Sequence, residues 1–171
     1  MIRFYLTLSA VIIMAALIPS AEDMAVSQNS PLTSHLCYMF GHANILHWAI
    51  NSWALLVLHN LFRPSRLIAA YILAFAISFL PHFSFVIYHL SFSPTGASVI
   101  GASVITCFFF GFLAPHLWHK DKLSACMMVA LIVIAFFIPG IAAVPHLLMF
   151  LAGLAWYYIE YIIRSFRHFC K

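Results

Sequence analysis

Residues 41–51 read Gly-His-Ala-Asn-Ile-Leu-His-Trp-Ala-Ile-Asn, and the rest of the chain can be understood from this stretch. It lies inside an apolar run long enough to cross a membrane, where polar side chains are costly unless they find partners. On a helix, His47 and Asn51 are four residues apart and share one face, and His42 is expected near the start of the same helix. This pattern predicts that the polar face points inward, away from lipid.

The composition indicates an integral membrane protein. Of the 171 residues, 65% are hydrophobic and only 7% are charged, whereas soluble proteins average about 25% charged residues. The mean hydropathy is +1.04. A crossing takes about 20 residues, so the chain has room for about six membrane helices joined by short loops. We therefore expect a single membrane domain over residues 1–171.

Prolines and charged residues divide the chain into six apolar spans. We expect them at about residues 4–18, 34–62, 67–80, 101–113, 123–138 and 142–163, with Pro115 ending the fourth. The first span could instead be a signal peptide, but five more spans follow, which favours a retained helix. An aromatic-rich segment at 83–94 is expected at the membrane interface.

The positive charges follow the same division. All eight Lys and Arg residues lie before the first span, between the second and third, between the fourth and fifth, or after the sixth: Arg3, Arg63, Arg66, Lys120, Lys122, Arg164, Arg167 and Lys171. These loops share one side of the membrane, and the positive-inside rule makes that side cytoplasmic, with both termini there. The net charge of +4 is thus explained by topology, and no nucleic-acid partner is expected.

The spacing of His42, His47 and Asn51 resembles the second transmembrane helix of the rhomboid intramembrane serine proteases, in their short bacterial form. The resemblance covers roughly residues 34–157. It implies an all-α, six-helix rhomboid-like bundle in a bacterial inner (plasma) membrane. It also implies hydrolysis of a peptide bond in or next to a substrate's transmembrane helix.

Two Gly-Ala-Ser-Val units offer a nucleophile, Ser98 in the first and Ser103 in the second. In rhomboids the nucleophile stands at the start of the fourth helix with a glycine eight residues later, and Gly111 has that position relative to Ser103. A serine that is reached from the outer side but lies below the membrane surface needs a short helix beneath it. The helix from Ser103 to Pro115 is shorter than one that would begin at Ser98. The interval from the second span fits Ser98 better. We favour Ser103 and keep Ser98 as the alternative; both units could also be only small-residue helix contacts.

The expected base lies in the sixth span. His146 is followed seven residues later by Gly153, an arrangement similar to the rhomboid sixth helix, in which the glycine lets the sixth helix pack against the fourth. The resemblance implies that His146 activates Ser103 without an aspartate. Such a dyad must hold its imidazole by packing, so close helix contacts at Gly111 and Gly153 are expected to serve the site.

The resemblance also assigns hydrogen-bond donors to the oxyanion. These are His47, Asn51 and the backbone amide of Ser103, with His42 lining the site. No cofactor or metal is expected, because no cluster of histidines and carboxylates lies inside a span and the four cysteines form no Cys-x-x-Cys pair. The expected partners are a transmembrane protein substrate and the lipid bilayer, and the oligomeric state is left open.

Two other functions compete with this interpretation. One is a catalytically inactive rhomboid-fold protein that binds or escorts membrane clients, and the other is a small transporter. An inactive relative would be expected to have lost one of the polar site residues. The presence of all of them favours the enzyme.

Overall fold

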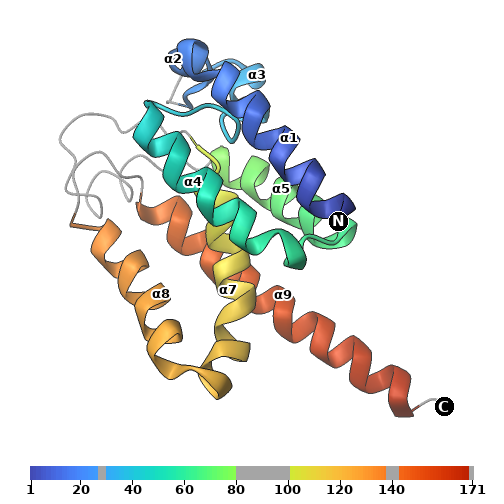
Figure 1. The fold of residues 1–171 in the computed structure, drawn as a ribbon. Coiled ribbons are helices and arrows are strands. Elements are labelled where there is room, and N and C mark those ends of the chain that lie inside the picture. Colours follow the sequence, from blue (N-terminus) through green and yellow to red (C-terminus); the bar gives the residue numbers. More distant parts are fainter. Residues whose placement is uncertain (27–29, 80–100, 138–142, 170–171) are drawn as a thin grey trace.

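The computed structural model describes residues 1–26, 30–79, 101–137 and 143–169, and every regular element in these ranges is a helix (Figure 1). The expected all-α class is therefore confirmed. In chain order the elements are α1 (Ile2–Ala16), η1 (Ile18–Ser20), α2 (Ala21–Met24), α3 (Leu32–Cys37), α4 (Ile45–Leu58), η2 (His59–Leu61), α5 (Pro64–Ser78), α7 (Ser103–Lys120), α8 (Lys122–Ala135) and α9 (Ala143–Phe169).

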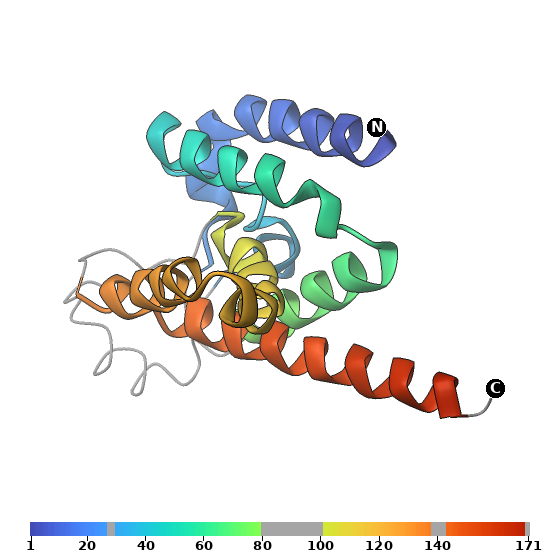
Figure 2. The same cartoon turned by 60° about the horizontal axis from the view of Figure 1, so that its bottom comes forward.

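Helix α7 lies at the centre of the bundle. It packs along α9, its most extensive contact, and also touches α8, α4 and α5 (Figures 1 and 2). Phe108 and Phe109 of α7 are fully buried in this core. Helix α1 lies beyond α4, and the indole nitrogen of Trp48 donates a hydrogen bond to the Val11 carbonyl across that contact, at 3.0 Å. The C-terminal part of α9 projects past the other helices (Figure 2).

The second span, expected over residues 34–62 with room for a half-buried entry segment, is not one helix. The chain forms α3, then a stretch without helix at 38–44, and then α4. The break has a local cause, because the side chain of Asn44 accepts a hydrogen bond from the backbone amide of His47 at 2.8 Å and so caps α4. His42 therefore precedes the helix that carries His47, rather than lying on it.

The prediction that Pro115 ends the fourth span is wrong, because α7 continues through it to Lys120. Proline removes one backbone hydrogen bond, but the bonds on either side can carry a helix past it. The end is set instead at Asp121, whose side chain accepts hydrogen bonds from Ser124 and caps α8. These hydrogen bonds, the one from the Ser124 hydroxyl first, hold the pKa of Asp121 below its ordinary value.

The other predicted spans match helices with shifted ends. Spans 4–18, 67–80, 123–138 and 142–163 correspond to α1, α5, α8 and α9. Among the described helices, α9 over residues 143–166 is long and apolar enough to cross a membrane, while α1, α5 and α8 are apolar but have 10–17 residues. The expected interfacial segment at 83–94 lies outside the described residues.

Positive residues from distant parts of the sequence meet at one end of the bundle. Arg3 donates a hydrogen bond to the Asn60 carbonyl at 3.1 Å, and Arg66 forms an ion pair with Glu160 at 2.7 Å. Since α7 and α9 run in the same direction, this end is opposite the N-terminus of α7 (Figure 1). The ion pair of Arg66 and Glu160 therefore lies at the end of the α7–α9 pair away from the starts of the two helices.

Candidate active site

Ser103 and His146 meet where α7 and α9 begin. Ser103 is the first residue of α7, and its Oγ lies 2.7 Å from Nε2 of His146, near the start of α9. This is the distance expected between a nucleophile and its general base. For the hydroxyl to donate, Nε2 must be unprotonated and the imidazole proton must sit on Nδ1. Both side chains are half-buried, so the pair is neither sealed in the core nor fully exposed.

Two glycines allow α7 and α9 to approach this closely. A Cβ on Gly111 would overlap the carbonyl of Phe150 on α9, and a Cβ on Gly153 would overlap the carbonyl of Phe108 on α7. These neighbours are backbone atoms, which cannot move aside as a side chain can. The close approach expected between the fourth and sixth spans is therefore confirmed, and it brings the starts of both helices together.

Gly101 lets side chains of α4 lie close to the segment that leads into Ser103. Its φ of +115° lies in the region that side-chain-bearing residues rarely adopt. A Cβ at this position would lie 2.7 Å from Cε1 and 2.8 Å from Nε2 of His47, and 3.4 Å from Nδ2 of Asn51. The imidazole and the amide therefore lie against the backbone two residues before Ser103. No larger residue could occupy this position without displacing His47.

The polar groups of this region are buried and incompletely paired. Asn51 is 5% exposed, and its Nδ2 has no hydrogen-bond partner in the described part of the chain. The same holds for Nε2 of His42, which is fully buried, with its ring centroid 5.1 Å from that of His47. Buried polar groups are almost always paired, so unpaired ones call for an explanation. Here the unpaired donor of Asn51 lies beside the segment that leads into the nucleophile.

The stretch at 38–44 is tied to the serine segment. The amide of Gly101 donates to the Tyr38 carbonyl at 2.8 Å, and the Tyr38 hydroxyl donates to the Ala74 carbonyl of α5, also at 2.8 Å. Nδ1 of His42 lies 3.3 Å from the Phe40 carbonyl. These bonds satisfy backbone groups of a partly buried stretch that has no helix to do so. They also hold Gly101 beside α4.

The structure thus brings four of the predicted site residues into two adjoining groups: Ser103 with His146, and His47 with Asn51 next to Gly101. His42 stands next to His47 from the stretch before α4. Ser98, the alternative nucleophile, lies outside the described residues. Sequence reasoning identified Gly101 only as part of a Gly-Ala-Ser unit and did not identify the anchoring role of Tyr38, since neither carries a sequence signal for it.

The arrangement provides a serine, a base within hydrogen-bonding distance, and an unpaired amide donor on Asn51 nearby, which are the parts that acyl transfer needs. Comparisons of the chain with protein-family models, curated proteins and solved structures found no match.

Proposed function

We propose that this protein is a rhomboid-type intramembrane serine protease with six membrane spans and both termini in the cytoplasm. It hydrolyses a peptide bond in or next to the transmembrane helix of a protein substrate. The observation that carries the proposal is the 2.7 Å contact between Ser103 Oγ and His146 Nε2. The two residues are 43 positions apart in the sequence, on two helices held together through glycines.

In the first half of the reaction, Oγ of Ser103 attacks the carbonyl carbon of the scissile bond while Nε2 of His146 takes the hydroxyl proton. The resulting tetrahedral intermediate carries its negative charge on the former carbonyl oxygen. Its collapse breaks the C–N bond, and His146 gives the proton to the leaving amine. In the second half, His146 removes a proton from water, which attacks the acyl-serine and releases the new carboxyl terminus.

The oxyanion is held by donors from α4 and from the start of α7. These are the ring N–H of His47, Nδ2 of Asn51 and the backbone amide of Ser103, while His42 lines the site. The lack of a partner for Asn51 Nδ2 supports this role, because an oxyanion hole requires a donor that is free before the substrate arrives. The contact of His47 with Gly101 keeps both side chains near the nucleophile.

The position of the site restricts the substrate. Ser103 begins α7, at the end of the bundle away from the ion pair of Arg66 and Glu160, so the site faces the non-cytoplasmic side in the proposed topology. A helical substrate hides its carbonyls in its own hydrogen bonds. Cleavable segments should therefore unwind easily near that membrane surface.

Labelling with a serine-reactive fluorophosphonate probe tests the proposal. The detergent-purified protein should be labelled on Ser103, and Ser103→Ala and His146→Ala should each abolish both labelling and cleavage of a model transmembrane substrate. Ser98→Ala is the matched control, because it removes a serine from an identical Gly-Ala-Ser-Val unit, and it should retain both activities. The reverse pattern for the two serines would move the nucleophile to Ser98. A folded wild-type protein that is neither labelled nor active would favour the inactive client-binding protein.

A further inference from the structure

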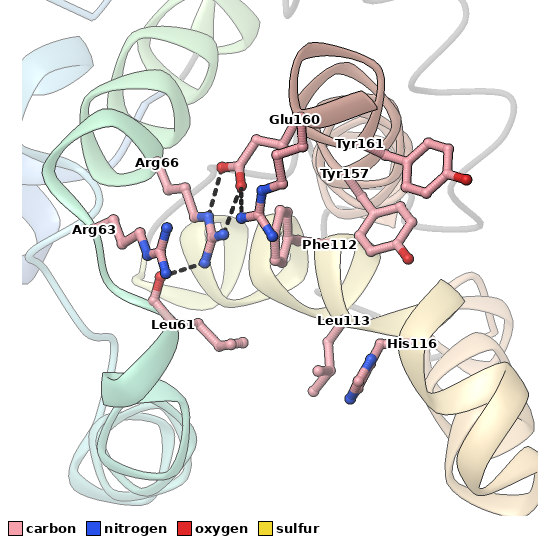
Figure 3. A pocket seen from close by; sticks show the side chains of 10 residues that line it. Leu61, Arg63, Arg66, Phe112, Leu113, His116, Tyr157, Glu160 and Tyr161 are labelled. Carbon is pink, nitrogen blue, oxygen red and sulfur yellow. Dashed lines mark hydrogen bonds and ion pairs between the residues drawn. The ribbon is translucent and has the colours of Figure 1, made fainter. Parts of the chain in front are cut away.

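A second site lies at the other end of the α7–α9 pair. A cavity of about 280 Å³ opens there between the start of α5, the second half of α7 and the second half of α9 (Figure 3). Glu160 is 14 residues beyond His146 on α9, a separation of about 21 Å along the helix axis. The cavity is therefore distinct from the serine–histidine site.

The cavity has an excess of positive charge. Three guanidinium groups line it, those of Arg63, Arg66 and Arg164, against the single carboxylate of Glu160, which leaves a net charge of +2. That carboxylate is already saturated. It accepts hydrogen bonds from Nε and Nη2 of Arg66, both at 2.7 Å, from Trp156 at 3.1 Å and from Arg164 at 3.0 Å. It cannot neutralise a further cation, so the surplus charge is available to a ligand.

Of the three arginines, Arg66 is held by contacts within the protein, whereas Arg63 and Arg164 are available to a ligand. Arg66 is 5% exposed, lies 3.9 Å above the ring of Phe112, and donates from Nη1 to the Leu61 carbonyl at 3.2 Å, so each nitrogen of its guanidinium is hydrogen-bonded within the protein. The Arg63 side chain is exposed and makes no hydrogen bond within the described part of the chain. The Arg164 side chain is 59% exposed, and its one hydrogen bond in the described part of the chain goes to Glu160.

The remaining wall suits the boundary between membrane and water. Tyr157 and Tyr161 line the cavity from α9 and His116 lines it from α7 (Figure 3). Tyrosines are enriched at the level of lipid headgroups, where the ring is apolar and the hydroxyl meets water. Leu61 and Leu113 also line the cavity and offer an apolar surface to acyl chains.

We infer that this cavity binds the phosphate of an anionic phospholipid. Guanidinium groups bind phosphate through paired N–H donors, and Arg63 and Arg164 both have donors to spare. In the proposed topology the cavity lies at the cytoplasmic surface, where anionic lipids attract basic residues near membrane helices. The apolar side chains of Leu61 and Leu113 in the cavity wall favour a lipid over free phosphate. This site is independent of the proposed proteolysis.

Binding can be measured on the full chain in a neutral detergent by native mass spectrometry, with phosphatidylglycerol, phosphatidylcholine and inorganic phosphate as separate arms. We expect preferential binding of phosphatidylglycerol. The double variant Arg63→Gln/Arg164→Gln should weaken it about 25-fold, because each basic residue near a membrane surface contributes roughly fivefold. This variant leaves Arg66 and its bonds to Glu160 in place. Its fold is checked by the melting temperature.

The matched control is Lys120→Gln/Lys122→Gln, which removes two exposed positive charges from the same end of the bundle but outside the cavity. It should change phosphatidylglycerol binding less than twofold. Equal binding of the two lipids would overturn the inference, as would an equal loss in the control variant. Displacement of the lipid by inorganic phosphate at the same concentration would also overturn it, since the site would then belong to a free anion. No readout depends on protease activity, so a failed protease test leaves this one intact.

Discussion

At the level of single residues, the role proposed for Asn51 in the site comes at a cost in the stability of the protein. Its Nδ2 is buried without a partner in the described structure. A buried donor left unpaired costs about 1–3 kcal/mol. Enzymes commonly retain such destabilising groups where the chemistry needs them.

We predict that Asn51→Leu raises the melting temperature in detergent while lowering turnover about 10²- to 10³-fold, the usual effect of losing one oxyanion donor. Asn51→Ala should also keep residual activity, whereas His146→Ala should leave essentially none. Thermal unfolding and cleavage of a model substrate measure the two effects.

Ser52 provides the matched control. It is the next residue on α4, is 4% exposed, and also has a hydroxyl without a hydrogen-bond partner in the described structure. Ser52→Ala should therefore stabilise the protein or leave it unchanged, with normal turnover. If Asn51→Leu instead lowers the melting temperature and the folded fraction cleaves normally, the asparagine is a structural clamp.

Among the helices, the contact between α7 and α9 affects both the stability of the protein and the position of His146 relative to Ser103. Gly153→Ala introduces a methyl group against the backbone of Phe108. We predict a loss of about 1–3 kcal/mol in the free energy of unfolding, as overpacking usually costs. Turnover should also fall, because α9 carries His146 and a small displacement moves it from Ser103.

Ala155→Leu is the control for this change, since it adds a larger side chain to an exposed position on the same helix. It should alter the free energy of unfolding by less than about 0.5 kcal/mol. Normal stability and activity in Gly153→Ala would contradict the contact as described.

The link between α5 and α9 gives a second prediction for the helices. Arg66 and Arg164 both contact the carboxylate of Glu160, but their side chains are 6% and 59% exposed. Removing one partner of a buried pair costs about 3–5 kcal/mol, whereas an exposed pair is worth about 0–1 kcal/mol. Arg66→Ala should therefore lower the melting temperature far more than Arg164→Ala. Equal effects would mean that Arg66 is not buried with its partner in solution.

At the scale of the whole molecule, two groups of polar residues lie at opposite ends of the bundle. Ser103 and His146 meet at one end, and Arg66, Glu160 and Arg164 meet at the other. If the six-span proposal is correct, the first end faces away from the cytoplasm and the second faces into it. The sidedness of the site is thus testable without any assay of activity.

We predict that Glu22→Cys is modified by a membrane-impermeant thiol reagent added to intact cells, whereas Lys120→Cys is modified only after permeabilisation. The four native cysteines, Cys37, Cys107, Cys126 and Cys170, are replaced beforehand so that they do not react. Modification of Lys120→Cys but not Glu22→Cys in intact cells would overturn the six-span topology.

Much of the fold could be predicted from local pattern. The helices α1, α5, α8 and α9 were anticipated, because an apolar run bounded by prolines and charges forms its hydrogen bonds within the segment. The break at 38–44 was missed, because hydropathy does not register that the Asn44 side chain caps a new helix. The continuation of α7 past Pro115 was missed because proline only weakens a helix that its neighbours support.

By itself the sequence determined the all-α class, the apolar segments and the residue types that the site contains. Only the tertiary structure decided that Ser103 and His146 are in contact, that Gly101 has a φ of +115° against His47, and that Arg66 and Glu160 pair across 94 positions. The physical reason is the range of the interactions. Helix hydrogen bonds join residues four apart, whereas these contacts depend on which faces of distant helices approach, and backbone atoms at Gly111 and Gly153 set that approach.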